Sequence, residues 1–320
     1  MDAGIIVQVV LLLVGFVFLI KGSDFFVDGA SSIASLLKIP TIIVGLTIVA
    51  LGTSAPEAAV SITSSLTGSN AMAVSNVIGS NLFNMLMVIG IAALISNLTM
   101  EKSVLEKDLP FLVGITVLWA IFIIVGWDIT NIEGIILLVI MIAYIIILVI
   151  NTRKSGEANE VEKPKFNLPK SIILILVGLA GIVLGGDLVV DSASAIAIAL
   201  GMSETLVGLT IVAIGTSLPE LVTSIIAAKK GKQDLALGNI IGSNIFNICI
   251  VLGLPVAIFG GIKPESFEML DVVMMVASAA LLWLVARRGS PISKKEGAFM
   301  LIVFAVYYGY IIANAIETMA

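Results

Sequence analysis

Apolar segments of about 20 residues recur from one end of this chain to the other, separated by short polar stretches. A helix needs roughly 20 consecutive apolar residues to cross a bilayer, so the pattern predicts an all-α polytopic membrane protein. The first segment has no basic region before it and no small-residue cleavage site, and we interpret it as a retained helix. Ten transmembrane spans fit the pattern, at residues 4–21, 41–66, 71–96, 109–126, 131–150, 171–187, 204–228, 234–260, 268–286 and 297–316.

The positions of the basic residues predict the orientation of these spans. Of the 17 lysine and arginine residues, all but Lys263 follow an odd-numbered span and therefore lie on one face of the membrane. Loops rich in Lys and Arg remain in the cytoplasm. We therefore expect a multi-pass protein of the cell membrane with both termini outside and the polar stretch 151–170 in the cytoplasm.

The chain contains an internal repeat. Adding 163 to a position between Gly22 and Gly90 gives its counterpart in the second half without a gap. The segments that end at Glu57 and Glu220 are nearly identical, and their polar residues are the same. A repeat that preserves polar residues inside apolar spans favours a shared function over packing alone.

The repeat also predicts the architecture. Each half has five spans, an odd number, so the second half enters the membrane in the opposite sense. We expect a first inverted-topology repeat at 1–150, a cytoplasmic linker at 151–170 and a second repeat at 171–320. This arrangement is typical of secondary transporters, whose substrate site lies near the membrane midplane between the repeats.

The most informative stretch is spelled Gly-Thr-Ser-Ala-Pro-Glu, ending at Glu57, and Gly-Thr-Ser-Leu-Pro-Glu, ending at Glu220. A carboxylate at this depth costs roughly 2.5–3.5 kcal/mol on insertion scales, which indicates a partner or a function. The proline of each copy should loosen the helix. The spacing predicts that Thr53 and Ser54 share a helix face with Glu57, and the second copy repeats this with Thr216, Ser217 and Glu220.

The following span in each half adds a serine and an asparagine four residues apart. These are Ser80 with Asn84, and Ser243 with Asn247. Small residues such as Gly79 and Gly242 should permit the helices to approach closely. The two spans together would present carboxylate, hydroxyl, amide and carbonyl oxygens to one centre, with no thiol or imidazole among them. Calcium takes six to eight oxygen ligands in flexible geometry, so the pattern predicts a site for a hard cation.

Several classes of chemistry are excluded or left open by composition. The chain has no histidine, which excludes histidine metal sites and Ser-His triads, and its single cysteine, Cys249, excludes a disulfide framework. Two carboxylates match one divalent cation, but several monovalent ions or protons would neutralise them as well. Four acidic residues at or just beyond the ends of the first and sixth spans are interpreted as helix caps or interfacial charges, with a role in ion entry left open: Asp24, Asp28, Asp187 and Asp191.

At these residues the chain resembles the cation/calcium exchanger superfamily, in particular its sodium/calcium exchanger branch. The repeats of that family carry G-[TS]-S-x-P-[ED] followed by G-S-N-x-x-[ND], which match Gly52–Glu57 with Gly79–Asn84 and Gly215–Glu220 with Gly242–Asn247. The resemblance implies that Glu57 and Glu220 are the central ligands for Ca²⁺ and Na⁺. It also implies ten further cation ligands, namely Thr53, Thr216, Ser54, Ser217, Ser80, Ser243, Asn84, Asn247 and the carbonyls of Ala50 and Ala213.

The function implied is a Na⁺/Ca²⁺ antiporter that exchanges about three Na⁺ for one Ca²⁺ by alternating access, with spans one and six sliding past the rest. We expect no enzymatic activity, no cofactor and no protein partner, and a monomer whose substrates are the two ions. The alternatives are a Ca²⁺/H⁺ antiporter that uses the same glutamates and a cation channel. An intramembrane hydrolase lacks a base beside any serine.

The residue at position 247 differs from that of the potassium-dependent branch of the superfamily. That branch typically has an acidic residue at the end of the second G-S-N-x-x motif, where this chain has Asn247. The resemblance therefore implies exchange that does not need K⁺. The short linker also departs from the animal exchangers, which carry large calcium-sensing domains there.

Overall fold

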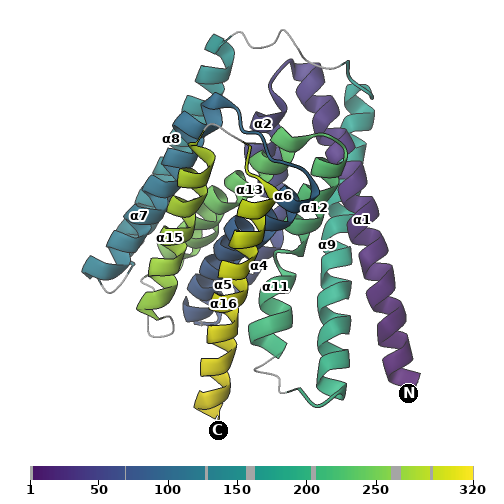
Figure 1. Cartoon of the computed structure of the whole chain (residues 1–320), viewed down its shortest axis with the longest axis vertical. Helices are drawn as coiled ribbons and strands as arrows, with labels where there is room; N and C mark the ends of the chain where they lie inside the picture. The colour runs from purple at the N-terminus through teal and green to yellow at the C-terminus, as the bar shows by residue number, and fades with distance from the viewer. Residues whose placement is uncertain are drawn as a thin grey trace.

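The structure, a computed structural model, describes residues 3–68, 70–126, 129–155, 163–202, 207–260, 268–288 and 291–319. Helices contain most of these residues, and none of them lies in a named strand, although an antiparallel β-bridge joins Leu98 to Ile292. The prediction of an all-helical polytopic membrane protein is confirmed (Figure 1).

The first half contains both ordinary α-helices and short π-helical segments, which are labelled η. The elements are α1 (Ala3–Leu37), α2 (Thr41–Val44), η1 (Gly45–Val49), α3 (Ala50–Thr53), α4 (Ala55–Leu66), α5 (Asn70–Leu82), η2 (Phe83–Val88), α6 (Ile89–Ile95), η3 (Val104–Asp108), α7 (Leu109–Gly126) and α8 (Asn131–Ser155).

The second half repeats this order. Its elements are α9 (Leu168–Ala199), η5 (Gly208–Val212), α11 (Ala213–Gly215), α12 (Leu218–Lys229), α13 (Gln233–Phe246), η6 (Asn247–Leu252), α14 (Gly253–Phe259), α15 (Met269–Ala286) and α16 (Lys294–Met319). The bounds of η1 and η5, and those of α4 and α12, differ by the same 163 residues that relate the two halves of the sequence.

Among the described residues, eight helices are long and apolar enough to cross a membrane, or nine if the bent pair Thr41–Thr53 and Ala55–Leu66 counts as one span. The predicted seventh span, 204–228, begins on residues outside the described ranges, so the count of ten stays a prediction. Helices α1 and α9 are longer than the predicted first and sixth spans, 4–21 and 171–187, because they continue to Leu37 and Ala199.

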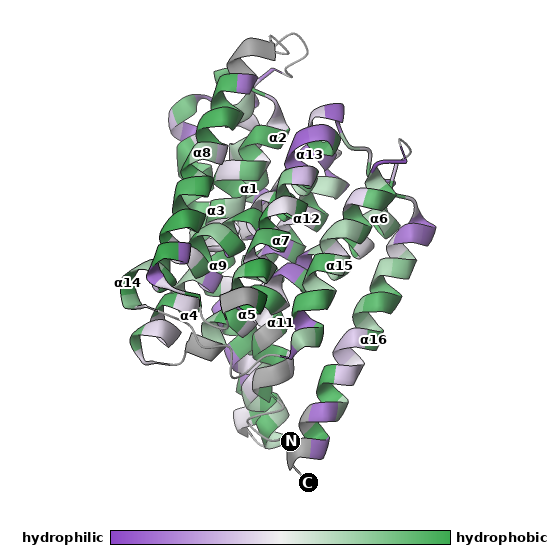
Figure 2. Cartoon of the chain, turned by 90° about the vertical axis from the view of Figure 1, so that its left-hand side faces the viewer, coloured by the Kyte–Doolittle hydropathy of each residue, from purple (hydrophilic) through white to green (hydrophobic). Residues whose placement is uncertain are grey.

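The helices form an inner and an outer group. In the most apolar windows of Met72–Ile95 and Gln233–Phe259, 72% and 83% of the residues are buried, whereas the figure for α1 is 11%. The polar repeated motifs therefore lie on inner helices, and apolar outer helices surround them. In Figure 2, outer helices such as α8 and α15 are coloured mostly as hydrophobic residues.

Helices α1 and α9 lie side by side along one edge of the molecule (Figure 1). Glycines make this contact close, because a Cβ built on Gly22 would lie 2.7 Å from the Gly178 carbonyl oxygen. A Cβ built on Gly185 would lie 2.5 Å from the backbone nitrogen of Leu19. The two long helices therefore pack backbone against backbone, as small-residue interfaces in membranes allow.

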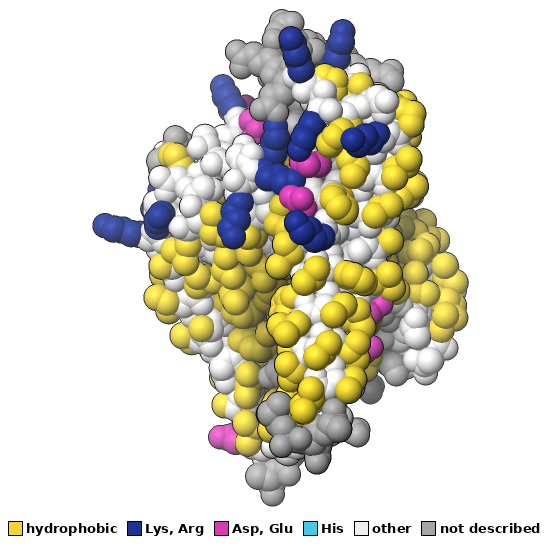
Figure 3. Space-filling model, turned by 90° about the vertical axis from the view of Figure 1, so that its right-hand side faces the viewer, with side chains coloured by type: hydrophobic (Ala, Val, Ile, Leu, Met, Phe, Trp, Pro, Cys, Tyr) yellow, Lys and Arg dark blue, Asp and Glu magenta, His cyan; other side chains and the backbone are white. Residues whose placement is uncertain are grey.

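Both termini lie at the lower end of the molecule, whereas α8 ends and α9 begins at the upper end (Figure 1). Lys and Arg side chains gather towards this upper end, above a largely hydrophobic surface (Figure 3). The described parts of the chain thus place the two termini opposite the junction between the halves. Lys263 lies outside the described residues.

A cluster of ion pairs joins α1 to two lysines from the second half of the chain. Lys230 Nζ lies 2.7 Å from Asp24 Oδ1 and 2.8 Å from Asp28 Oδ1, and Lys165 Nζ lies 2.9 Å from Asp28 Oδ2. Asp24 and Asp28 are therefore interfacial ion-pair partners, and the expectation that they could cap a helix is wrong because both lie inside α1.

Their counterparts in the second half have different surroundings. Asp187 and Asp191 lie within α9 and are exposed. The helix continues past Asp187 for a further twelve residues to Ala199, although the predicted sixth span stops at residue 187. The position equivalent to Lys230 is Thr67, which has no charge with which to pair them.

The two copies of the motif glycine are packed unequally. A Cβ built on Gly242 of α13 would lie 2.7 Å from both the Ala50 Cβ and the Leu46 carbonyl oxygen. At Gly79, the equivalent position on α5, no atom of the described residues lies within 4 Å of such a Cβ. Among the described residues the prediction of close approach therefore holds at Gly242, where η1 and α3 pack on α13, and fails at Gly79, which has no such neighbour.

We predict that Gly242→Ala lowers the melting temperature of the purified protein more than Gly79→Ala does. The added methyl group must displace the backbone of η1 in the first variant, and such overpacking costs about 1–3 kcal/mol. Thermal unfolding of the two variants in one detergent measures the difference. Equal melting temperatures would show that the two sites are equally open.

Candidate cation site

A break in the helix places each glutamate. Helix α3 ends at Thr53, Ser54 has φ −83° and ψ 7°, and α4 begins at Ala55, with a bend of 46° between the two segments. Pro56 occupies the first turn of α4, where a missing N–H costs nothing. The predicted shared helix face of Thr53 and Glu57 is therefore wrong, because the helix is interrupted between them.

Each glutamate consequently lies in the first turn of a new helix. Glu57 is in the first turn of α4 and Glu220 in that of α12. Backbone N–H groups at a helix N-terminus lack intrahelical partners and carry a partial positive charge that favours a carboxylate. Both side chains are 0% exposed. The break thus provides a favourable place for a negative charge deep in the protein.

The hydroxyl groups of the repeated motif cross from one half to the other. Ser54 Oγ donates to Glu220 Oε1 at 3.1 Å, and Ser217 Oγ donates to Glu57 Oε1 at 3.2 Å. Neither serine hydroxyl caps its own helix, so both are available to donate to the glutamate of the other half. The two motifs therefore build one site.

The following spans complete the contacts of each carboxylate. Ser80 Oγ donates to Glu57 Oε1 at 3.5 Å, and Ser243 Oγ donates to Glu220 Oε1 at 3.4 Å. Each glutamate oxygen Oε1 thus receives one hydroxyl from its own half and one from the other half. The four serines that were predicted to line the site all contact the glutamates.

The second oxygen of each carboxylate has no hydrogen-bond partner among the described residues. Glu57 Oε2 and Glu220 Oε2 are buried and receive no hydrogen bond from the described residues. No salt bridge among the described residues includes either glutamate. Buried carboxylates without a basic partner are costly unless they bind a cation or a proton. The arrangement therefore suits a positively charged ligand.

The two threonines have unequal positions. Thr53 is fully buried, and its Oγ1 lies 2.9 Å from Asn239 Oδ1, 3.4 Å from the Ala50 carbonyl and 3.4 Å from Ser243 Oγ. Thr216 is partly exposed, and its Oγ1 lies 3.5 Å from Asn76 Oδ1. The threonine of the first half is thus enclosed more tightly than that of the second.

Asn76 and Asn239 are site residues that the sequence reasoning did not assign. Asn76 Nδ2 donates to the Glu57 carbonyl at 3.2 Å and to Ser61 Oγ at 3.1 Å, and Asn239 Nδ2 donates to Ser224 Oγ at 3.0 Å. Each asparagine presents its Oδ1 to a motif threonine. Their identity at equivalent repeat positions was the signal that could have revealed them.

Asn84 and Asn247 lie near this network but do not hydrogen bond to either glutamate among the described residues. Asn247 Nδ2 donates to Asn81 Oδ1 at 3.1 Å, while its own Oδ1 has no partner. Both side-chain polar atoms of Asn84 are buried without a described partner. Unsatisfied buried amides call for a ligand or water, so a role in completing the site stays a prediction.

The two predicted carbonyl ligands occupy equivalent places. Ala50 begins α3, and its carbonyl accepts from Thr53 Oγ1 at 3.4 Å and from the Ser54 backbone N–H at 3.0 Å. Ala213 begins α11, three residues before Thr216. The Ala50 carbonyl therefore lies beside the motif threonine of its half, and the role of the Ala213 carbonyl stays a prediction.

Among the described residues, no three carboxylate, imidazole or thiol side chains gather in one place. A cation at this site would be held by two carboxylate oxygens and by neutral hydroxyl, amide and carbonyl oxygens. Hard cations such as Ca²⁺ and Na⁺ accept such ligands, whereas soft metals prefer sulfur or nitrogen.

The family model described as sodium/calcium exchanger protein matches residues 7–150 and, a second time, residues 170–313. The chain belongs to the sodium/calcium exchanger family. The two matches are displaced by the repeat offset of the sequence, since both ends of the second lie 163 residues after those of the first. The earlier identification with the cation/calcium exchanger superfamily is confirmed.

Several known proteins are similar to this chain over almost its whole length and almost the whole of their own. The putative antiporter CaxA of Alkalimonas amylolytica is 40% identical over 94% of this chain and 98% of its own length. The sodium/calcium exchanger MaX1 of Methanosarcina acetivorans is 32% identical over 95% of this chain and 98% of its own. A solved structure of the sodium-calcium exchanger NCX_Mj, soaked with Na⁺ and Ca²⁺, superposes with a TM-score of 0.83 at 32% identity over 94% of this chain and 97% of its own.

We predict that Glu57→Gln and Glu220→Gln each reduce Ca²⁺ transport by at least about a hundredfold while the protein still folds. Each variant removes one of two charges opposite a divalent ion, and charge-assisted contacts in a buried site are worth about 3 kcal/mol or more. Uptake of radioactive calcium into proteoliposomes measures the loss. Glu106→Gln is the matched control, because Glu106 is exposed and lies outside the site. Robust flux in both site variants at normal protein levels would remove these glutamates from the site.

Proposed function

We propose that this exchanger is an electrogenic Na⁺/Ca²⁺ antiporter in which both ions use the oxygen site around Glu57 and Glu220. The observation that carries the proposal is the pair of buried carboxylates whose Oε2 atoms have no partner among the described residues. The family relationship and the names of the similar proteins support sodium and calcium as the exchanged ions.

Charge balance explains how one site serves two ions. Two carboxylates neutralise one Ca²⁺, and when Ca²⁺ leaves, Na⁺ ions must replace its charge in a region of low dielectric constant. If about three Na⁺ replace one Ca²⁺, each cycle moves one net positive charge across the membrane. The hydroxyl groups of Ser54, Ser80, Ser217 and Ser243, together with the Ala50 and Ala213 carbonyls, are the proposed oxygen ligands of the flanking sodium ions.

The proposed mechanism is alternating access between two inverted repeats, 1–150 and 171–320. The doubled family match and the repeated helix breaks support this division. In this mechanism α1 and α9 slide together past the inner helices, and their glycine-lined contact would let them move as one unit. The clustering of Lys and Arg at the end opposite the termini supports termini outside and residues 151–170 in the cytoplasm.

We predict that an inward sodium gradient drives Ca²⁺ out of proteoliposomes and that the flux responds to membrane potential. Each tenfold gradient is worth about 1.4 kcal/mol per monovalent ion. At zero potential, a tenfold Na⁺ gradient should therefore balance about a thousandfold Ca²⁺ gradient for three Na⁺ and about a hundredfold gradient for two. A calcium indicator inside the vesicles, with the potential clamped by an ionophore, measures this balance. Calcium movement that follows a proton gradient in sodium-free buffer and ignores sodium would identify a Ca²⁺/H⁺ antiporter instead.

Asn247 is the basis for proposing that exchange does not need K⁺. Its amide is fully buried and contributes no charge, so the site keeps two formal negative charges. A carboxylate at this position would add a third charge and favour an additional monovalent cation.

We predict that replacing K⁺ by choline on both sides leaves sodium-driven Ca²⁺ flux within about twofold of its original value. Asn247→Asp should change the ratio of Na⁺ to Ca²⁺ affinity by about tenfold, because an added carboxylate near the site contributes about 1.4 kcal/mol or more. Asn81→Asp is a useful comparison, since Asn81 Oδ1 accepts from the Asn247 amide and, among the described residues, Asn81 makes no hydrogen bond to either glutamate. Loss of flux that K⁺ restores would contradict this role of Asn247.

A further inference from the structure

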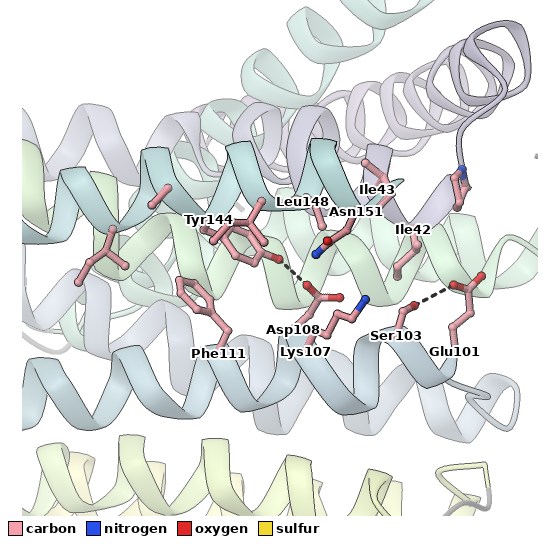
Figure 4. A pocket seen from close by; sticks show the side chains of 14 residues that line it. Ile42, Ile43, Glu101, Ser103, Lys107, Asp108, Phe111, Tyr144, Leu148 and Asn151 are labelled. Carbon is pink, nitrogen blue, oxygen red and sulfur yellow. Dashed lines mark hydrogen bonds between the residues drawn. The ribbon is translucent and has the colours of Figure 1, made fainter. Parts of the chain in front are cut away.

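A second cavity lies away from the glutamates, between α2, the η3–α7 helix and α8 (Figure 4). Its volume of about 360 Å³ is within the range of ligand pockets, roughly 300–1,000 Å³. We call it the α7–α8 cavity. None of the proposed cation ligands lines it, so it is not part of the transport site.

The α7–α8 cavity reaches the lipid-facing surface. Ile147 lines it and is 56% exposed, and Ala143, one turn earlier on α8, is exposed as well. Opposite them, Phe111 and Ile43 are partly buried and complete an apolar wall. A ligand of this cavity can therefore enter sideways from the bilayer and place a hydrocarbon chain inside.

One end of the cavity holds a positioned carboxylate. The rings of Phe111 and Tyr144 stack with centroids 4.3 Å apart and an interplanar angle of 9°. The stacked Tyr144 hydroxyl donates to Asp108 Oδ1 at 2.9 Å. Among the described residues Asp108 Oδ2 receives no hydrogen bond, and Figure 4 shows the carboxylate directed into the space between α7 and α8. This oxygen is available to a ligand.

The mouth carries charges of both signs. Lys107, adjacent to Asp108, is exposed and lines the cavity, as does Glu101 at the same end. The stretch before α7 also carries Lys102, so this end of the cavity lies at the basic end of its span, where phospholipid headgroups would be found. A ligand with an anionic and a cationic group would match Lys107 and Asp108 together, whereas a purely anionic headgroup would face two carboxylates.

We propose that the α7–α8 cavity binds a phospholipid whose headgroup joins a phosphate to a primary ammonium group. The phosphate pairs with Lys107, the ammonium donates to Asp108 Oδ2, and an acyl chain lies along Phe111 and Ile147. A primary ammonium has N–H donors for the carboxylate, whereas a quaternary ammonium has none. The cavity therefore distinguishes phosphoethanolamine from phosphocholine headgroups.

The position of the site gives binding a structural consequence. Ile42 and Ile43 of α2 line the cavity, and α2 continues through η1 and α3 to Thr53 of the cation site. A bound lipid would fill the space beside α2 and oppose its displacement towards α8.

The test measures lipid binding to the delipidated, full-length protein by native mass spectrometry. The probes are phosphatidylethanolamine, phosphatidylcholine and phosphatidylglycerol with identical acyl chains. We expect phosphatidylethanolamine to bind about tenfold more tightly than phosphatidylcholine at one saturable site. Asp108→Asn should remove this preference, and Lys107→Gln should weaken both lipids. Glu106→Gln and Lys102→Gln are matched controls on the same stretch, since both side chains are exposed and outside the cavity.

A second variant keeps the carboxylate and its tyrosine intact. Ala143→Trp places a large side chain at the exposed lateral opening and should abolish the saturable site without changing the melting temperature of the lipid-free protein. Equal binding of the three lipids, stronger binding of phosphatidylglycerol, or a preference unchanged in Asp108→Asn would each overturn the proposal. Since none of these measurements uses transport, they are independent of the proposed function.

Discussion

The burial of two carboxylates without a basic partner is the constraint on which the rest of the structure depends. Glu57 and Glu220 are fully enclosed, and no described lysine or arginine reaches them. Their position is favourable only because each helix is broken just before its glutamate, which supplies backbone N–H groups, and because serines from both halves donate to Oε1. The close packing of α13 on η1 and α3 then holds the two halves together around this charge.

Hydropathy and the repeat predicted the membrane fold and the convergence of the four serines on the glutamates. The offset of 163 residues identifies equivalent positions but says nothing about contacts between the halves, so the crossing of Ser54 to Glu220 was not predicted. Helical spacing failed for Thr53 because it assumes a continuous helix. Asn76 and Asn239 were missed because a buried asparagine often only hydrogen bonds to a neighbouring backbone group, so its residue type alone does not indicate a site.

The ends of the long helices illustrate a second limit of sequence reasoning. The predicted first span stops at residue 21, before Asp24 and Asp28, yet α1 continues past both aspartates because Lys230 and Lys165, which are far away in the sequence, form ion pairs with them. In α9, Asp187 and Asp191 continue the helix at an exposed face. A hydropathy average over neighbouring residues does not include an oppositely charged side chain that the tertiary structure brings close from elsewhere in the sequence.

The difference in packing between Gly79 and Gly242 has a consequence for the conformations that the molecule can adopt. Two identical glycines on equivalent helices have different neighbours, so the sequence is more symmetric than the shape. A shape that uses one of two equivalent contacts has a counterpart in which their roles are exchanged. Under the proposed alternating access, the duplication that produced the second half would also have supplied this second conformation.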